Sequence, residues 1–298
     1  MTDSHIQTSH VKRAFSSATD SYDAHAVLQR EIADRLLGHL AFTKIEPKRI
    51  LDIGCGTGYF TRLLRDKFKG AEIVAVDLSE TMLCRTRKGH ARRLPWHGYN
   101  RHIVGDAAAL PLQSETFDLV CSNLTMQWLP DPQSMLQEMR RVLAPGGLML
   151  FSTFGRRTLG ELRQSLASIA PERAGHVLPF PDVTSLGDAL MKLPIELPVT
   201  DTDLFTLTYP DAISLIRELK GLGASAAAIR GRKSGLYGRQ LIHRLEQEYS
   251  DKHRGEDGKI YATFEALYGQ AWYKQAGYEY GDHTIPIRVE GDINLGGI

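Results

Sequence analysis

The 298-residue sequence has few of the features that would mark a secreted, metal-stapled or membrane protein. Its three cysteines, Cys55, Cys84 and Cys121, are scattered and show no metal-ligand spacing, so we expect reduced thiols and no bound metal. No apolar run approaches the roughly 18 residues of a membrane span. The N-terminus is mainly polar, which argues against a secretory signal. We therefore expect a cytoplasmic protein with no membrane segment.

An excess of charge of one sign is also missing. Lys plus Arg (36) almost balance Asp plus Glu (35), so the formal net charge is +1. This balance gives no support for a general nucleic-acid-binding surface. With 42% hydrophobic residues and no internal repeat, the chain can bury a sizeable core as one large domain with an elaboration.

Short buried runs alternate with helical patterns from residue 49 onward. A glycine cluster follows the first run, and a helix over 132–143 is expected to stop at Ala144-Pro145-Gly146-Gly147. Such alternation predicts an α/β protein with a mostly parallel, seven-stranded sheet and helices on both faces. The expected strands lie within 50–53, 71–79, 101–111, 117–124, 146–154, 201–209 and 259–274; the second is expected to end at Asp77, the third near Asp106 and the fourth near Asn123.

The glycine turn after the first run indicates the kind of ligand. Gly54, Gly56 and Gly58 form G-x-G-x-G, whereas a dinucleotide-binding fingerprint would need its third glycine where Tyr59 stands. Asp52 would repel a pyrophosphate but would suit a ligand that carries an ammonium and a sulfonium group. S-adenosylmethionine is such a ligand, and the glycines would let the backbone approach it closely.

Acidic residues end successive strands of the expected sheet. Asp77 can accept hydrogen bonds from both ribose hydroxyls, while Asp106 with Ala107 can hold the adenine amino group. Leu78 and Met82 are placed to pack on the adenine ring. Each feature alone has a structural alternative, since an aspartate often caps a helix and a methionine often fills a core. Together with the glycine turn they favour a cofactor site at the carboxyl edge of the sheet.

Several motifs resemble a known family. "LDIGCGTG", "VAVDLSETML", "GDAAALPL", "FDLVCSNLTMQWLPD" and "VLAPGGLMLFSTF" resemble the class I S-adenosylmethionine-dependent methyltransferases, which have a Rossmann-like sheet. "FSSATDSYDAHAVLQ", "SNLTMQW", "TLGELR" and "LKGLGASAAAIRGR" are similar to the malonyl-acyl-carrier-protein O-methyltransferases of biotin synthesis. Two stretches depart from the pattern: "SAAAIRGRK" lacks the usual polar residue, and the tail 277–298 has no match.

This resemblance implies an acceptor and a way of binding it. The partner would be an acyl carrier protein whose malonyl group has a free carboxylate, and Asn123 would join the cofactor contacts. That carboxylate is already ionised at neutral pH, so no general base and no catalytic dyad are expected, and the sequence singles out no catalytic residue. A positively charged or donor-rich clamp would position it, and arginine suits this role because guanidinium groups bind carboxylates in bidentate geometry. Candidates for holding the acceptor are Tyr22, Gln127, Trp128, Arg156, Arg157, Arg230 and Arg232.

The segments that flank the core are expected to cover the site. A loop from Phe15 to His25 would close over the sulfonium, with Tyr22 touching the cofactor, or Tyr22 would simply pin the loop to the surface. Thr158 and Glu161 show a capping-box pattern for a helix after the fifth strand, which would begin a helical cap. The expected organisation is a lid and helix (1–47), a cofactor-binding core (48–155), a cap with the last two strands (156–276) and a tail (277–298).

Other functions share the same core. A methyltransferase of another small acid, a quinone or a phenol would differ only in the cover, and a non-methylating assembly factor or hydroxylase could keep the fold. Ser122-Asn123-Leu124-Thr125 stands where nucleic-acid amino-methyltransferases have an Asn/Asp-Pro-Pro-aromatic turn, which disfavours a nucleic-acid substrate. We expect a monomer that acts on the carrier-bound malonyl group.

Overall fold

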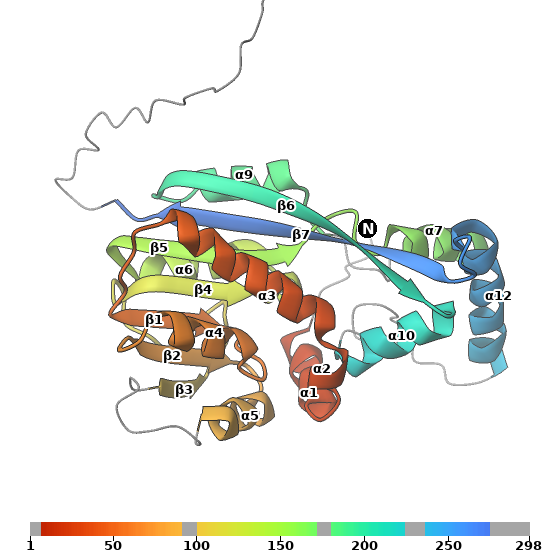
Figure 1. Cartoon of the computed structure of the whole chain (residues 1–298), viewed down its shortest axis with the longest axis horizontal. Helices are drawn as coiled ribbons and strands as arrows, with labels where there is room; N and C mark the ends of the chain where they lie inside the picture. Colours follow the sequence, from red (N-terminus) through yellow and green to blue (C-terminus); the bar gives the residue numbers. More distant parts are fainter. Residues whose placement is uncertain (1–6, 91–99, 172–179, 224–235, 275–298) are drawn as a thin grey trace, which may run out of the picture.

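The computed structural model describes residues 7–90, 100–171, 180–223 and 236–274. A seven-stranded sheet in the order β3-β2-β1-β4-β5-β7-β6 runs through these ranges (Figure 1). Neighbouring strands are parallel except where β7 lies antiparallel between β5 and β6. This confirms the expected α/β class. The strands are β1 (Arg49–Ile53), β2 (Glu72–Asp77), β3 (Asn100–Val104), β4 (Phe117–Asn123), β5 (Leu143–Phe154), β6 (Glu196–Tyr209) and β7 (Ile260–Trp272).

The strand register brings the ends of the central strands to one edge. Ile53 at the end of β1 pairs with Val76 of β2 on one side and with Ser122 of β4 on the other. Asp77 and Asn123, one residue further along each neighbour, therefore project at the same carboxyl edge. Because β1, the strand between them, is buried on both faces, that edge is where polar side chains gather.

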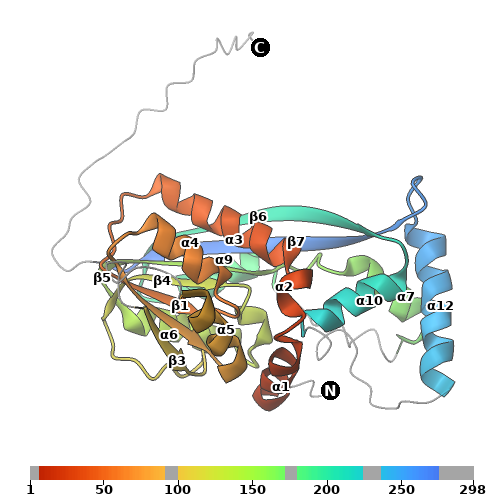
Figure 2. The ribbon, with the colours of Figure 1, turned by 60° about the horizontal axis from the view of Figure 1, so that its bottom comes forward.

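Helices cover both faces of the sheet, and a separate apolar cluster lies on each face. On one face α3 (Val27–His39) and α4 (Tyr59–Lys67) pack through Leu28, Ile32, Phe60 and Leu64. On the other face lie α6 (Pro132–Val142) and α9 (Val183–Met191) (Figure 2). A side-chain oxygen of Asp131 accepts the Gln133 N–H at 3.0 Å and so caps the start of α6.

The N-terminal cover is helical rather than a loop. Residues expected to form a loop lie in α1 (Thr8–Ala18) and α2 (Tyr22–His25), and η1 (Leu40–Phe42) follows α3. Val11, Phe15 and Ala18 fall on one side of α1 at spacings of four and three residues, as an amphipathic helix requires. No proline or glycine interrupts residues 7–37, so nothing local opposes the helices.

The cap contributes more helices than the sequence patterns predict. The helices of the cap are α7 (Gly160–Ile169), α10 (Ala212–Gly221) and α12 (Leu236–His253). The sequence patterns did not predict α12, nor did they predict α9. The predicted capping box does not form. Thr158 instead exchanges hydrogen bonds with the backbone of Glu265, and Glu161 accepts from the backbone and hydroxyl of Thr263. Both residues therefore fasten the start of α7 to β7.

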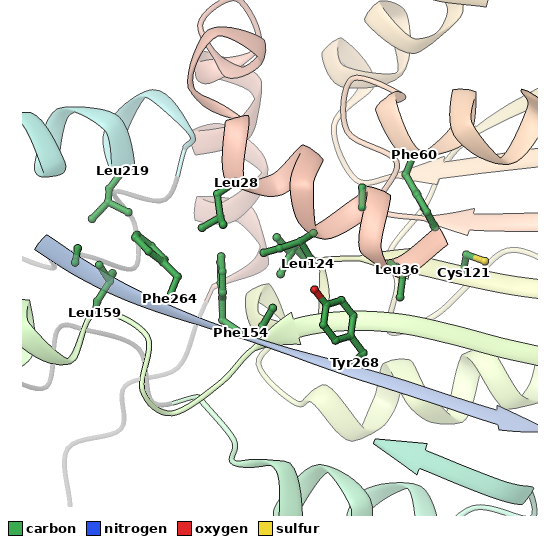
Figure 3. Packing of buried hydrophobic residues seen from close by; sticks show 14 of the residues in the cluster. Leu28, Leu36, Phe60, Cys121, Leu124, Phe154, Leu159, Leu219, Phe264 and Tyr268 are labelled. Carbon is green, nitrogen blue, oxygen red and sulfur yellow. The ribbon is translucent and has the colours of Figure 1, made fainter. Parts of the chain in front are cut away.

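The core continues from the sheet into the cap. Figure 3 shows Leu28, Leu124, Phe154, Phe264 and Leu219 converging from α3, the strands and α10. These residues belong to one buried cluster, so cap and sheet share hydrophobic packing. None of the helices in the described ranges combines the length and apolar character needed to cross a membrane.

Candidate functional site

A cavity lies at the carboxyl edge of the sheet, beneath the N-terminal cover. Its walls come from the strand ends, from α1, from the start of α7 and from the end of α10. Residues expected from the sequence to form the site meet here. Those that line the cavity are Tyr22, Gly54, Gly56, Asp77, Leu78, Met82, Asp106, Ala107, Asn123, Gln127 and Trp128.

The glycine turn is held open by backbone conformation. Gly54 and Gly56 both have positive φ angles, of 71° and 55°. A Cβ on Gly54 would lie 2.0 Å from the Thr125 hydroxyl, whereas a Cβ on Gly56 would meet nothing within 4 Å. Gly56 therefore leaves an open cradle that any side chain would fill. Gly58 does not line the cavity, contrary to the sequence-based expectation; a Cβ there would lie 2.6 Å from Thr86, so Gly58 lets α4 begin close to α5 (Glu80–His90).

Asp77 is fixed in place by two backbone amides. Its Oδ2 accepts from Gly56 N and its Oδ1 from Ser79 N, both at 2.8 Å. Burial raises the pKa of Asp77, and the two amide hydrogen bonds oppose that rise. Each carboxylate oxygen keeps a further lone pair, so a diol such as a ribose can still donate to both.

Next to Asp77, the cavity wall consists of apolar side chains and the carboxylate of Asp106. Asp106 Oδ1 accepts the Ala108 N–H at 2.9 Å, which orients the carboxylate. Met82 is 1% exposed and, like Leu78, faces the cavity from the β2–α5 side. This part of the cavity therefore combines apolar walls with one carboxylate that can accept hydrogen bonds.

Asp52 lies beneath the glycine turn rather than on the main cavity. It is 1% exposed, and its Oδ2 accepts the Thr61 hydroxyl at 2.5 Å. Burial, with a smaller contribution from the charge of Asp77, raises the pKa of Asp52 to about 7, and the Thr61 hydrogen bond opposes the rise. Asp52 borders a second, smaller pocket that adjoins the first.

That second pocket brings in residues that the sequence did not single out. Gln29 lines both pockets, and its buried Oε1 has no hydrogen-bond partner among the described residues. Arg30 Nη1 donates to the Asp23 carbonyl at 2.7 Å, and the Thr57 hydroxyl donates to Asp23 Oδ1 at 2.6 Å. The pocket therefore offers a cation and carboxylates to a zwitterionic group. Only the proximity of α2 and α3 to the turn reveals this, so the sequence carried no signal for it.

Aromatic rings close the cavity from the side of the cover. The Phe15 ring lies 5.2 Å from that of Trp128 in an edge-on arrangement and 6.4 Å from that of Tyr22. Burial, followed by the charges of Asp77 and Asp23, raises the pKa of the Tyr22 phenol, so it stays protonated and can donate. The rings shield this part of the cavity from solvent and present faces that attract a cation.

The far end of the cavity is apolar and uncharged. Gln127 is 7% exposed; its Nε2 donates to the Leu124 carbonyl at 2.7 Å and its Oε1 accepts from Thr153 at 3.2 Å. A primary amide has a second N–H, which is left for a ligand. Beyond Gln127 the walls are Phe154, Leu159, Phe180, Leu219, Leu222 and Phe264, several of which are labelled in Figure 3.

The arginine clamp expected after the fifth strand does not form. Arg156 is largely exposed and lies 3.4 Å from Asp182, while Arg157 is exposed on the same loop, and neither lines the cavity. The loop directs both side chains to solvent because the backbone of Arg157 is tied to Glu265. Arg230 and Arg232 lie outside the described residues. Within the described ranges, no Lys, Arg or His lines the main cavity.

Comparison with known proteins places the chain in a family. A family model described as a methyltransferase domain matches residues 51–151. A malonyl-[acyl-carrier protein] O-methyltransferase from Halorhodospira halophila is 41% identical over 280 residues, covering 94% of this chain and 92% of the relative. A protein of the same name from Laribacter hongkongensis is 42% identical over 270 residues, covering 89% of each chain.

Solved structures share the fold at much lower identity. A Bacillus halodurans structure described as a methyltransferase has a TM-score of 0.58 at 19% identity, covering 82% of this chain and 99% of that one. The YcgJ protein from Bacillus subtilis has a TM-score of 0.57 at 17% identity, covering 82% of this chain and all (100%) of that one. With relatives that match nearly end to end, the chain belongs to the malonyl-[acyl-carrier protein] O-methyltransferase family, and its cofactor is S-adenosylmethionine.

Proposed function

We propose that the protein transfers a methyl group from S-adenosylmethionine to the free carboxylate of a malonyl group on an acyl carrier protein, giving the methyl ester. The observation that carries the proposal is a single cavity with two different ends. One end offers carboxylates to a nucleoside, and the other combines neutral donors with apolar walls. The names of near full-length relatives supply the acceptor.

The residues present fit the cofactor. Asp77 would take the ribose hydroxyls, and Asp106 with Met82 and Leu78 would hold the adenine. The open cradle at Gly56 leaves room for the chain that joins the ribose to the amino-acid group. In the second pocket, Asp52 and Arg30 have charges opposite to those of an ammonium and a carboxylate, and the unpartnered Gln29 Oε1 would accept an ammonium proton.

The reaction needs positioning more than acid–base chemistry. The cofactor, when bound, supplies an electrophilic methyl group on a sulfonium. Tyr22, with Asn123, Gln127 and Trp128, would orient the acceptor carboxylate toward that methyl. Because Tyr22 stays protonated, its phenol acts as a hydrogen-bond donor and does not compete as a nucleophile.

The apolar end favours the attacking carboxylate. Phe154, Phe180 and Phe264 exclude water that would otherwise solvate the anion. Neutral donors hold the oxygen without neutralising it, whereas a directly bound arginine would stabilise the ground-state anion that the reaction consumes. The acceptor loses its charge as the ester forms, so an uncharged chamber suits product formation.

The test is transfer of a labelled methyl group to malonyl-loaded carrier protein. We expect a base-labile ester on that acceptor and no label on acetyl-loaded carrier protein, which lacks the carboxylate. Labelling of the acetyl form, or no ester on the malonyl form, would leave a methyltransferase of another acceptor.

A further inference from the structure

We propose that the acyl carrier protein docks on the exposed basic faces of α1 and α10, the two helices that flank the acceptor end of the cavity. This inference rests on the proposed function and specifies how its partner is recognised. It concerns a protein surface that lies outside the cavity and takes no part in methyl transfer.

Both helices border the cavity through one face. Val11 and Phe15 of α1 line it, as do Leu219 of α10 and Leu222 just after α10. The segments are in close contact, because a Cβ on Gly223 would lie 3.3 Å from backbone atoms of Ala14 and Phe15. Figures 1 and 2 show α1, α2 and α10 side by side in both views.

The opposite faces of these helices are basic. Lys12 and Arg13 are exposed on α1, and Arg217 and Lys220 are exposed on α10. Neither helix exposes an acidic residue: α1 contains none, and Glu218 of α10 is half-buried with its carboxylate bonded to the Tyr209 hydroxyl at 2.9 Å. In a chain of net charge +1, this is a local concentration of one sign.

The acidic residues that follow α1 are bonded to groups on the other side of the cover. Asp20 lies 2.6 Å from Arg85 of α5, and Asp23 accepts the Thr57 hydroxyl at 2.6 Å. Their hydrogen-bond partners belong to α5 and to the glycine turn, on the cofactor side. The basic faces of α1 and α10 are therefore left to act on an approaching partner.

Acyl carrier proteins are strongly acidic, so their surface complements these faces. Docking there would place the thioester arm beside Val11 and Leu222, from which the apolar walls lead toward Gln127 and the reacting methyl. Complementary charge of this kind raises the rate of encounter and fixes orientation, more than it adds contact energy at the reacting atoms.

The experiment compares three double charge reversals in the full chain. Lys12→Glu/Arg13→Glu alters α1, and Arg217→Glu/Lys220→Glu alters α10. Lys44→Glu/Lys69→Glu is the matched control, because these exposed lysines precede β1 and β2 at the opposite edge of the sheet. Each variant is assayed with malonyl-carrier protein and with malonyl-pantetheine, which has the same arm without the protein.

We expect the α1 and α10 variants to raise KM for malonyl-carrier protein about tenfold or more at low salt. Their kinetics with malonyl-pantetheine, cofactor affinity and melting temperature should match those of the control. Equal effects on both acceptors, or no effect on the carrier-protein KM, would overturn the docking surface. Absence of methyl ester from both acceptors with the unaltered enzyme would instead refute the proposed function.

Discussion

Asp77 has two roles, and replacing it by alanine removes both of them. It faces the cavity, and it also holds the amides of Gly56 and Ser79. Asp77→Ala should weaken S-adenosylmethionine binding by about 1–3 kcal/mol, because charge-assisted hydrogen bonds to the ribose are lost. Titration calorimetry measures the affinity. Asp118→Ala, which removes an acceptor for backbone amides of Lys48 and Arg49 away from the cavity, is the control and should leave binding unchanged. Wild-type affinity in the Asp77 variant would contradict the ribose contact.

Asp52 should make the stability of the unliganded protein depend on pH. The pKa of Asp52 is about 7 in the folded protein, against about 3.9 in an unfolded chain. Between these values the folded state holds a proton that the unfolded state has released, so the free energy of unfolding falls as pH rises from 4 to 7. Asp52→Asn removes that fall. The melting temperature of the variant minus that of the wild type should therefore increase from pH 5 to pH 8.

A second measurement links Asp52 to the cofactor. An ammonium bound in the second pocket favours the Asp52 carboxylate, so cofactor binding near pH 7 should release a proton. Calorimetry in buffers of different ionisation enthalpy detects that proton, and Asp52→Asn should abolish its release. If the variant releases as many protons as wild type, the amino-acid group does not bind near Asp52.

Strand-end residues could be predicted from the sequence because parallel strands bring their carboxyl ends together. Asp77 and Asp106 each follow an apolar run that the sequence marks as a strand, so their meeting at one edge follows from the fold class. Arg30 and Gln29 could not be predicted in the same way. They reach the site only because α3 crosses above the turn, and no local pattern records that crossing. Arg156 was misassigned because the loop after β5 turns its side chain outward toward Asp182.

At the scale of elements, the N-terminal cover should be separable from the core. Of the residues that the structure describes, 7–25 contribute nothing to the two large buried clusters, whereas Leu28, Ile32 and Leu36 of α3 belong to one of them. Deleting residues 1–25 should therefore lower turnover by about 10²-fold or more through loss of positioning. Thermal scanning should show a melting temperature lowered by only a few degrees. A truncated enzyme with full activity would refute the cover.

In the intact chain, hydrogen bonds between hydroxyl groups attach the N-terminal cover to the core. Ser16 bonds to Ser79 at 2.9 Å and Thr19 to Thr81 at 3.0 Å, and these hydroxyls join α1 to the start of α5. Ser79 also donates its amide to Asp77, so cover and cofactor end share a residue. This linkage could not be read from the sequence, since the partners are more than 60 residues apart and serine and threonine are common on any surface.

The other strands and helices were predicted well where apolar residues recur regularly in the sequence, and poorly where they do not. Strands β1 to β5 were located to within about three residues, while β6 begins at Glu196, ahead of the expected 201–209, because its alternating pattern is weaker where Pro198 interrupts it. The helix α9 follows a proline-rich stretch and was missed, although Asp182 caps it by accepting from Ser185 N at 2.8 Å. Helix α12 mixes polar and apolar residues, and its packing partner, α7, lies far away in the sequence.

At the scale of the whole molecule, the cavity is lined by segments that do not all pack together in the hydrophobic core. Its walls combine α1, the glycine turn, the strand ends, the start of α7 and the end of α10. A ligand that fills the cavity contacts all of these at once, so its binding free energy acts against opening of any of them. The unliganded protein lacks that linkage, and the cover is held by its part-buried hydroxyl contacts and by the packing of Val11, Phe15 and Ala18.

Cofactor binding should therefore protect the cover and the glycine turn together. At about 100 times its dissociation constant, S-adenosylmethionine should stabilise the fold by about 2.7 kcal/mol, which raises the melting temperature of a chain of this size by about 4–5 °C. Hydrogen exchange should slow both in residues 54–58 and in residues 8–25, since opening either one releases the ligand. In Asp77→Ala both effects should diminish in parallel at the same ligand concentration. Protection confined to residues 54–58 would mean that the cover opens while the cofactor stays bound, and the methyl group would then be exposed to water in the absence of acceptor.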